Sequence, residues 1–266
     1  MKTNYLKCCD CVEGMLGLPD DSIDLTVTSP PYDNARNYDG YVFDFENVAK
    51  QLYRITKQGG VVVWIVNDTT HNGTESLTSF KQALYFRSIG FNLHDTMIWI
   101  KDGGGAVGSQ KCYYQNFEYM FVFSKGKPTH INLIEDKLNK SFDPTKDKDY
   151  GVVRKAGRRK KDGTIKHEFR HQPRQYSKRN NWWYCVPGRN QETQNHPAPF
   201  PEYICEGHIK SWSNENDVVF DPFMGSGTTA KMAILNNRKY IGFDCSQRYI
   251  DIAQERINNT IREMNK

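Results

Sequence analysis

Hydrophobic residues occur along this chain in two alternating patterns. Short apolar runs predict strands at 4–9, 22–28, 61–66, 94–100, 117–123, 217–221 and 240–244. Apolar positions spaced by three and four predict helices at 45–55, 76–88, 201–212 and 226–237, and a closing helix after Ser246. Repeated alternation of strand and helix is typical of an α/β fold with a mostly parallel sheet covered on both faces.

Helix ends carry their own signals. Asp44 is a predicted N-cap of the helix at 45–55, and Gly59-Gly60 is predicted to end that helix before the next strand. Ser246 is the predicted N-cap of the last helix, whose residues Ile250, Ala253, Ile257 and Ile261 recur at helical intervals. We expect these four residues to pack on the sheet.

Residues 125–181 show neither the apolar runs of a strand nor the three-and-four spacing of a helix. They are polar and charged, and Pro and Gly interrupt them. Residues 137–179 hold 15 Lys and Arg against 5 Asp and Glu, a net charge of +10, so the rest of a chain of net charge +5 sums to −5. The segment is either a solvated loop or an insert that contacts nucleic acid, with Phe169, Tyr176, Trp182 and Trp183 available for stacking. We favour the insert because of the motifs around it. The candidate phosphate-binding residues are Arg154, Lys155, Arg158, Arg159, Lys160, Lys161, Arg170 and Arg174.

Composition narrows the class of protein. At 266 residues the chain can form one catalytic domain interrupted by an insert, with boundaries at 1–124, 125–181 and 182–266. The N-terminus lacks a signal-peptide pattern and no run approaches the roughly 20 apolar residues that cross a bilayer, so we expect a cytoplasmic protein with reduced thiols. Cys8 and Cys11 form a C-x-x-C without a second ligand pair, and we expect no metal.

A glycine-rich turn follows the strand at 217–221. The sequence Asp221-Pro-Phe-Met-Gly-Ser-Gly-Thr-Thr-Ala230 is typical of a turn at which a cofactor approaches the backbone and helix amides attract its carboxylate. Gly225, Gly227 and Ala230 also fit the dinucleotide pattern, and Asp244 could bind the ribose of NAD or of S-adenosylmethionine. A nicotinamide oxidoreductase is therefore an alternative at this point.

Thr28-Ser29-Pro30-Pro31-Tyr32 distinguishes the two alternatives. It follows a strand, where an open α/β sheet presents its active site. An exocyclic base amine is a poor nucleophile, and acceptors aimed at its hydrogens increase its reactivity. The Ser29 hydroxyl and the Pro30 carbonyl can accept these hydrogen bonds, and Tyr32 offers a face on which a flipped base can stack.

Together the two motifs resemble those of the permuted DNA amino-methyltransferases, which methylate cytosine N4 or adenine N6. The resemblance implies that S-adenosylmethionine is bound by Asp221, Pro222, Phe223, Gly225, Ser226, Gly227, Thr228 and the ribose-binding Asp244. It also matches Asp10 to an acid near the donor's adenine, although Cys9 replaces the usual glycine. Phe200 and Pro201 match, less closely, a His-Pro segment that completes the donor pocket.

The resemblance implies a seven-stranded, Rossmann-like methyltransferase sheet, circularly permuted, with the strand before Asp10 beside the strand that ends at Asp244. The basic insert occupies the place of the target-recognition region, which implies double-stranded DNA as partner. A homodimer and a cognate restriction endonuclease are further partners found in such systems. Three polar residues after the tetrapeptide could line the base pocket or contact phosphate, or could belong to an ordinary loop. They are Asp33, Asn34 and Arg36.

The resemblance implies that Ser29 at the first position of the tetrapeptide favours cytosine N4, because Asp is more usual at this position in the adenine-N6 enzymes. Two other classes stay open on the residues alone. Methylation of protein glutamine is associated with Asn-Pro-Pro-Tyr, and Ser29 and the basic insert argue against it. A DNA-binding module without catalysis would leave both motifs unused.

Overall fold

The computed structural model describes residues 1–31, 43–101, 113, 115–139, 153–171, 175–186 and 201–266, with the backbone alone at 153–158 and 166–171. Contacts divide the chain into two units, Met1–Asn132 with Asn181–Lys266, and Leu133–Asn180. No helix among the described residues is long and apolar enough to cross a membrane.

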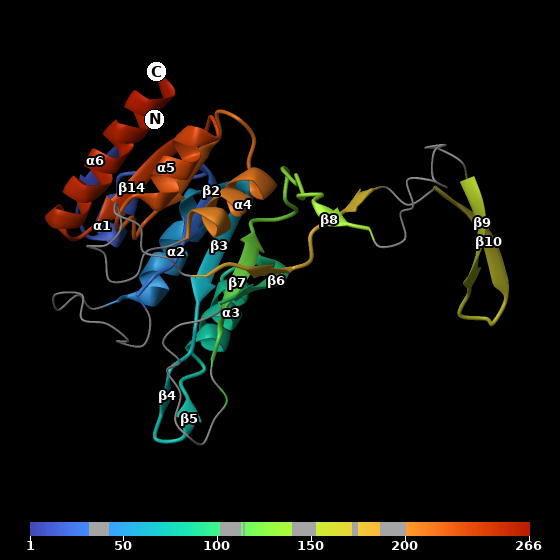
Figure 1. Cartoon of the computed structure of the whole chain (residues 1–266). Helices are drawn as coiled ribbons and strands as arrows, with labels where there is room; N and C mark the ends of the chain where they lie inside the picture. The colour runs from blue at the N-terminus through green and yellow to red at the C-terminus, as the bar shows by residue number, and fades with distance from the viewer. Residues whose placement is uncertain (32–42, 102–112, 114, 140–152, 172–174, 187–200) are drawn as a thin grey trace. The chain divides into compact units, whose positions relative to one another are not determined.

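An eight-stranded sheet forms the centre of the first unit (Figure 1). Its order is β1-β14-β13-β2-β3-β7-β6-β12. The strands are β1 (Tyr5–Cys8), β2 (Ile23–Thr28), β3 (Thr56–Val66), β6 (Asn92–Ile100), β7 (Phe117–Ser124), β12 (Trp182–Tyr184), β13 (Val218–Asp221) and β14 (Lys239–Asp244). The five strands from β1 to β3 are mutually parallel, and β7 is antiparallel to both of its neighbours. The carboxyl ends of the five parallel strands therefore meet at one edge of the sheet.

The permuted methyltransferase sheet that the sequence predicts is confirmed, including the pairing of β1 with β14. The sheet has one strand more than the seven expected, because Trp182–Tyr184 joins its edge as β12, parallel to β6. The side chain of Trp183 is buried, whereas Trp182 and Tyr184 are each about half exposed. This alternation is that of a strand with one covered face.

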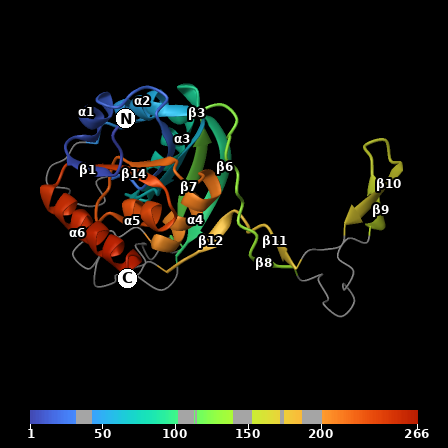
Figure 2. The same ribbon diagram turned by 90° about the horizontal axis from the view of Figure 1, so that it is seen from above.

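Helices cover both faces of the sheet, as Figure 2 shows from above. Buried residues of α1 (Cys11–Leu16), α2 (Phe45–Ile55) and α3 (Thr78–Ser88) pack with Val62, Trp64 and Val66 of β3. On the other face, α4 (Glu202–Trp212), α5 (Thr228–Leu235) and α6 (Gln247–Met264) pack with Val61 and Val63. A strand buried on both faces reads as a continuous apolar run, as the sequence of β3 does.

Local differences from the predicted elements have simple causes. Asp44 caps α2 as predicted, by accepting from the Asn47 amide, but β3 begins at Thr56 and includes Gly59 and Gly60. Gly59 has φ of +81° and its amide bonds to the Lys125 carbonyl, so the glycine pair lies within the strand and does not end the helix.

The last helix differs from its predicted pattern at two positions. Ser246 occupies the N-cap of α6 but makes no side-chain capping bond. Ile250, Ala253 and Ile257 are buried as predicted, whereas Ile261 is 43% exposed. Thr260, at the adjacent helical position, is buried in its place, and its hydroxyl donates to the Arg256 carbonyl at 2.9 Å.

The second unit contains two small antiparallel pairs. One joins β8 (Lys137–Leu138) to β11 (Tyr176–Ser177), and the other joins β9 (Val153–Arg159) to β10 (Ile165–His171). The segment in which the sequence shows neither a strand nor a helix period therefore contains a two-stranded ribbon of seven residues a side. A hairpin of β4 (Thr70–His71) and β5 (Thr74–Glu75) belongs to the first unit.

A buried arginine connects three elements of the first unit. Arg256 of α6 is 3% exposed, donates to the Thr228 hydroxyl at 2.9 Å and the Ser226 carbonyl at 3.2 Å, and pairs with Glu202 at the start of α4. We expect Arg256→Met to lower the free energy of unfolding by about 3 kcal/mol, because it leaves these acceptors without their shared donor. Urea denaturation measures this change.

The matched control is Arg262→Met on the exposed side of the same helix. It is expected to change stability by less than about 0.5 kcal/mol. Equal effects of the two substitutions would contradict a structural role for the Arg256 contacts.

Candidate active site

The predicted catalytic tetrapeptide begins where β2 ends. Ser29 and Pro31 are half-buried and Pro30 is buried, while Tyr32 lies outside the described residues. β2 pairs in parallel with β13 on one side and with β3 on the other. The chain thus leaves the sheet at Ser29, between β13 and β3. β13 is the strand that leads to the predicted donor loop.

The predicted donor loop joins β13 to α5. Gly225 and Gly227 have φ of +52° and +83°, and a Cβ added at Gly227 would lie 2.8 Å from the Cβ of Ala253. Two backbone hydrogen bonds hold the loop. The Met224 amide donates to the Phe243 carbonyl at 2.8 Å, and the Gly227 amide donates to the Met224 carbonyl at 2.9 Å. Both glycines are therefore required by the backbone conformation and close packing of this turn.

This loop suits S-adenosylmethionine by its geometry. α5 begins with Gly227 as N-cap and no side chain caps it. The amides of its first turn are positioned to bind a carboxylate, which the partial positive charge of a helix N-terminus favours. Phe223 is half-buried, with its ring 5.5 Å from that of Phe43 in an edge-to-face arrangement.

Asp221 is a buried carboxylate with three donors. Its Oδ1 accepts from the Thr28 hydroxyl at 2.7 Å and the Phe223 amide at 3.0 Å, and its Oδ2 accepts from the Thr229 hydroxyl at 2.7 Å. Burial raises the pKa of Asp221 to about 6, against the lowering effect of these donors. The carboxylate is therefore mostly ionised at neutral pH and connects three segments of chain.

Asp244 ends β14 at the same edge. Its Oδ2 accepts from the Gly225 amide and its Oδ1 from the Ser246 amide, each at 2.9 Å. Burial raises its pKa, while the two amide donors lower it. An ionised carboxylate has about four acceptor sites, so these two bonds leave capacity for a ligand hydroxyl.

Asp10 follows β1, beside β14. Its Oδ1 accepts from the Val12 and Glu13 amides at 2.8 and 3.1 Å, which makes it the N-cap of α1. The sequence motif did not indicate this capping role. Cys8 pairs with Asp244 in the register of the two strands, so Asp10 lies close to the same edge.

The His-Pro segment is only partly described. Pro201 is the N-cap of α4 and its carbonyl accepts from the Cys205 amide, whereas Phe200 and His196 lie outside the described residues. The same is true of Asp33, Asn34 and Arg36.

Sequence reasoning missed a polar pair at the end of β3. Asn67 and Asp68 are 8% and 4% exposed. Asp68 accepts from the Ser79 amide at 2.9 Å and the Ser76 hydroxyl at 3.2 Å, and Asn67 accepts from Gln115 at 3.0 Å. An Asn-Asp pair directly after a long apolar strand was the available signal, because the active site of such a sheet lies at its carboxyl edge.

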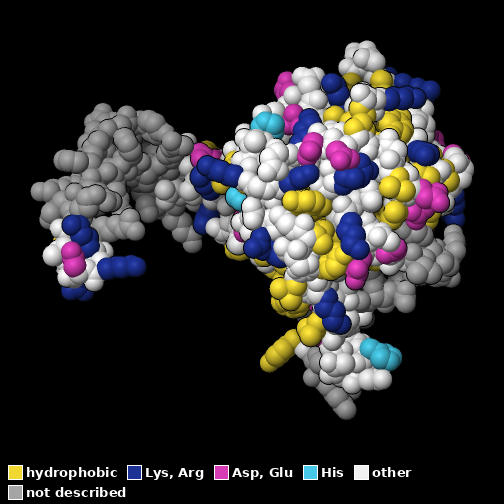
Figure 3. Space-filling view, turned by 180° about the vertical axis from the view of Figure 1, so that it is seen from behind, with side chains coloured by type: hydrophobic (Ala, Val, Ile, Leu, Met, Phe, Trp, Pro, Cys, Tyr) yellow, Lys and Arg dark blue, Asp and Glu magenta, His cyan; other side chains and the backbone are white. Residues whose placement is uncertain are grey.

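The candidate DNA-binding residues belong to the second unit. Arg159, Lys160 and Lys161 are exposed at the turn of the β9–β10 ribbon, and Lys and Arg side chains gather at its coloured tip in Figure 3. Arg154, Lys155 and Arg158 lie in β9 and Arg170 in β10, while Arg174 lies outside the described residues. In the register, Arg154 pairs with Arg170 and Arg158 with Lys166.

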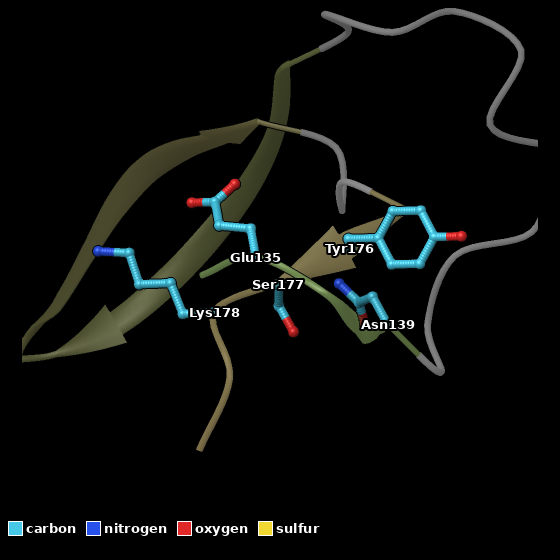
Figure 4. Close-up of a pocket in the computed structure, with 5 residues that line it drawn as sticks. All are labelled: Glu135, Asn139, Tyr176, Ser177 and Lys178. Carbon is cyan, nitrogen blue, oxygen red and sulfur yellow. The ribbon is translucent and has the colours of Figure 1, made fainter. Parts of the chain in front are cut away.

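An open depression in the second unit contains Tyr176, one of the predicted stacking residues, and none of the predicted catalytic, donor-binding or phosphate-binding residues. Glu135, Asn139, Tyr176, Ser177 and Lys178 line it (Figure 4). Within the described parts of the chain, no group of three or more His, Cys, Asp or Glu side chains is arranged to hold a metal ion.

Comparison with known proteins gives the family. The N6_N4_Mtase family, described as DNA methylase, matches residues 23–255. The chain is 54% identical over 248 residues to the orphan methyltransferase M.BamHII of Bacillus amyloliquefaciens, and the match covers 91% of each protein.

Solved structures support the fold. A putative DNA modification methylase of Thermus thermophilus, TTHA0409, complexed with S-adenosyl-L-methionine, matches with a TM-score of 0.62 and 23% identity over 96% of this chain and 95% of that one. The cytosine-N4-specific PvuII DNA methyltransferase matches with a TM-score of 0.67 and 18% identity over 100% of this chain and 92% of that one.

The family match decides between the alternatives of the sequence analysis. A nicotinamide oxidoreductase and a module without catalysis are both excluded, because the match spans the tetrapeptide, the insert and the glycine loop. The chain belongs to the N6_N4_Mtase family of DNA methylases, and it is an S-adenosylmethionine-dependent DNA methyltransferase.

Proposed function

We propose that this enzyme methylates cytosine N4 in double-stranded DNA, after flipping the base into a pocket at the carboxyl edge of the sheet. The observation that carries the proposal is the adjacency of β2 and β13. It places Ser29 beside the loop of residues 222–227, which begins where β13 ends. A base amine at Ser29 would therefore lie within reach of a donor bound at that loop.

The residues at the end of β2 act on the amine. The Ser29 hydroxyl and the Pro30 carbonyl accept hydrogen bonds from its two hydrogens, which localises the nitrogen lone pair and stabilises the positive charge that develops there. Pro31 restricts the chain that follows, and Tyr32 is proposed to stack on the flipped base. The amine proton leaves to water after transfer, so no strong base is required.

Donor binding is proposed for the residues around the glycine loop. Asp244 would bind the ribose hydroxyls of the donor. The amides at the start of α5, from Thr228, would bind its carboxylate. The rest of the donor would contact Asp10, Phe200 and Pro201. S-adenosylmethionine supplies the methyl group as an electrophilic sulfonium. Gly225, Ser226 and Gly227 allow the backbone to approach it closely, while Pro222 and Phe223 shape the turn.

Cytosine is favoured over adenine because a serine begins the tetrapeptide. The PvuII enzyme, which this chain resembles in fold, is named as cytosine-N4-specific. Adenine N6 is the alternative within the same family. The nucleoside formed by the enzyme distinguishes the two bases directly.

The second unit is proposed to bind the DNA backbone. Its cations would release counterions from phosphates, a contribution that does not depend on base sequence. The register of β9 and β10 supports this role, because it pairs like-charged residues that an anion would stabilise. A homodimer and a cognate restriction endonuclease stay predictions.

Ser29→Ala is expected to lower kcat for DNA methylation by about 100-fold or more, because one acceptor for the amine is removed. The assay uses methyl-labelled S-adenosylmethionine and mixed-sequence duplex, and mass spectrometry of the digested DNA identifies the nucleoside. We expect N4-methylcytosine, and N6-methyladenine would overturn the choice of base.

Ser22→Ala, just before the other end of the same strand, is the control and is expected to leave kcat within about twofold, as for a surface change. The Ser22 hydroxyl, which the substitution removes, donates to the nearby Pro19 carbonyl at 2.7 Å. Full activity of Ser29→Ala would refute the assigned role of Ser29.

Asp244→Ala is expected to weaken the binding of S-adenosylmethionine by about 10- to 100-fold, since hydrogen bonds to a charged group each contribute roughly 1.5–3 kcal/mol. Isothermal titration calorimetry without DNA measures this affinity. Asp251→Ala, at an exposed position of α6, serves as control. An unchanged dissociation constant for Asp244→Ala would remove this residue from the donor site.

Replacing Arg159, Lys160 and Lys161 together by Ala is expected to weaken DNA binding and to lower the slope of log K against log salt concentration by about 2 to 3, roughly 0.9 for each phosphate that is no longer neutralised. Fluorescence anisotropy with a labelled duplex measures the slope. The control replaces three exposed cations of the first unit, Arg248, Arg262 and Lys266. The same change of slope in both variants would argue against a specific role for the ribbon turn.

A further inference from the structure

A fully enclosed hydrogen-bonded group lies between the predicted catalytic and donor segments. Thr28 ends β2, Asp221 ends β13 and Thr229 lies in the first turn of α5, and all three are at most 4% exposed. The two hydroxyls donate to different oxygens of Asp221, each at 2.7 Å. The Thr229 hydroxyl also lies 3.4 Å from the Val27 carbonyl, which adds a second link from α5 to β2.

This arrangement is costly for stability alone. Burying an ionised carboxylate is unfavourable, and well-packed apolar residues of similar size are often as stable as a buried charged group. Each donor bond to the carboxylate is charge-assisted and therefore short and directional. Such a group fixes the relative position of the segments that contribute to it more strictly than apolar contacts would.

The segments it joins are the two that must be aligned for methyl transfer. Thr28 directly precedes Ser29, and the Phe223 amide, which bonds to the same Asp221 oxygen at 3.0 Å, belongs to the donor loop. One oxygen atom thus holds the chain entering the tetrapeptide and the chain entering the glycine turn. Asp221 is 4% exposed, so its carboxylate is enclosed by the segments that donate to it.

We propose that Thr28 is a positioning residue for methyl transfer, whose hydroxyl, held by Asp221, fixes Ser29 and the Pro30 carbonyl relative to the donor loop. The inference rests on the proposed role of Ser29. Asp221 then acts through Thr28 and the Phe223 amide, and not by direct contact with the donor. Loss of the Thr28 hydroxyl frees the end of β2 to shift relative to the loop while each segment stays folded.

The strand itself provides a matched control. Thr26 lies two residues before Thr28, on the same face of β2, and is also fully buried. Its hydroxyl has no hydrogen-bond partner among the described residues. The change from Thr to Val removes a hydroxyl and keeps the shape at either position, so the two variants differ in the contact with Asp221.

We expect Thr28→Val to lower kcat by about 10- to 100-fold, the effect of misplacing reacting groups by about 1 Å. The dissociation constant for S-adenosylmethionine and the KM for DNA should stay within about threefold, because Thr28 is fully buried and exposes no surface to either ligand. Thr26→Val should leave all three parameters unchanged. Thr28→Ser, which restores the hydroxyl, should recover most of the activity.

The experiment measures steady-state methylation of duplex DNA at about pH 8, where Asp221 is ionised, together with calorimetric donor binding and thermal unfolding of each variant. Thr28→Ala is added as a second deletion of the hydroxyl that cannot overfill the site. Equal kcat for Thr28→Val and Thr26→Val would overturn the inference, as would a loss in donor affinity that accounts for the loss in activity.

Ser29→Ala in the same series separates the two proposals. If Ser29→Ala is inactive and Thr28→Val is fully active, the function of the tetrapeptide stands and the positioning role of Thr28 is refuted. If Ser29→Ala is fully active, the proposed function of Ser29 fails, and a loss in Thr28→Val alone would then contradict the claim that Thr28 acts through Ser29.

Discussion

Five parallel strands end at the same edge of the sheet, and the chemistry of the enzyme depends on this constraint. Parallel pairing of β1, β14, β13, β2 and β3 brings together chain segments that are far apart in sequence, such as Thr28 and Asp221. Each strand leads into a connecting segment at that edge. The sheet therefore brings together the start of the tetrapeptide at Ser29, the glycine turn, and the carboxylates of Asp10 and Asp244, although they come from distant parts of the chain.

Polar contacts inside the apolar layers fix these loops more narrowly than the sheet alone. Asp221 joins β2, β13 and α5, and Arg256 joins α6, α4 and the glycine turn through Glu202, Ser226 and Thr228. Burying the Asp221 carboxylate and the Arg256 guanidinium is unfavourable unless their hydrogen-bonding atoms have partners. Their presence beside the active site is consistent with positioning, which catalysis by alignment requires.

Binding of DNA and chemistry are divided between the two units in the proposed mechanism. The first unit contains the donor loop and the tetrapeptide, and the second contains most of the excess positive charge. Electrostatic attraction to phosphates needs no fixed core, whereas methyl transfer needs groups held within fractions of an ångström. A small unit built on two short ribbons suits the first task, and a buried eight-stranded sheet suits the second.

The sequence by itself determined the strand and helix periods, the α/β class, the glycine turn and the position of the tetrapeptide at a strand end. These features depend on neighbouring residues, because the alternation of apolar positions and the turn residues are local. The family resemblance gave the pairing of β1 with β14. Only the tertiary structure decided that Trp182–Tyr184 adds an eighth strand, that β3 begins at Thr56, and that Ile261 is exposed. Pairing across a sheet, burial and shared hydrogen bonds depend on partners distant in sequence. For that reason the enclosed position of Asp221 between Thr28 and Thr229 could not be found from the motif that contains it.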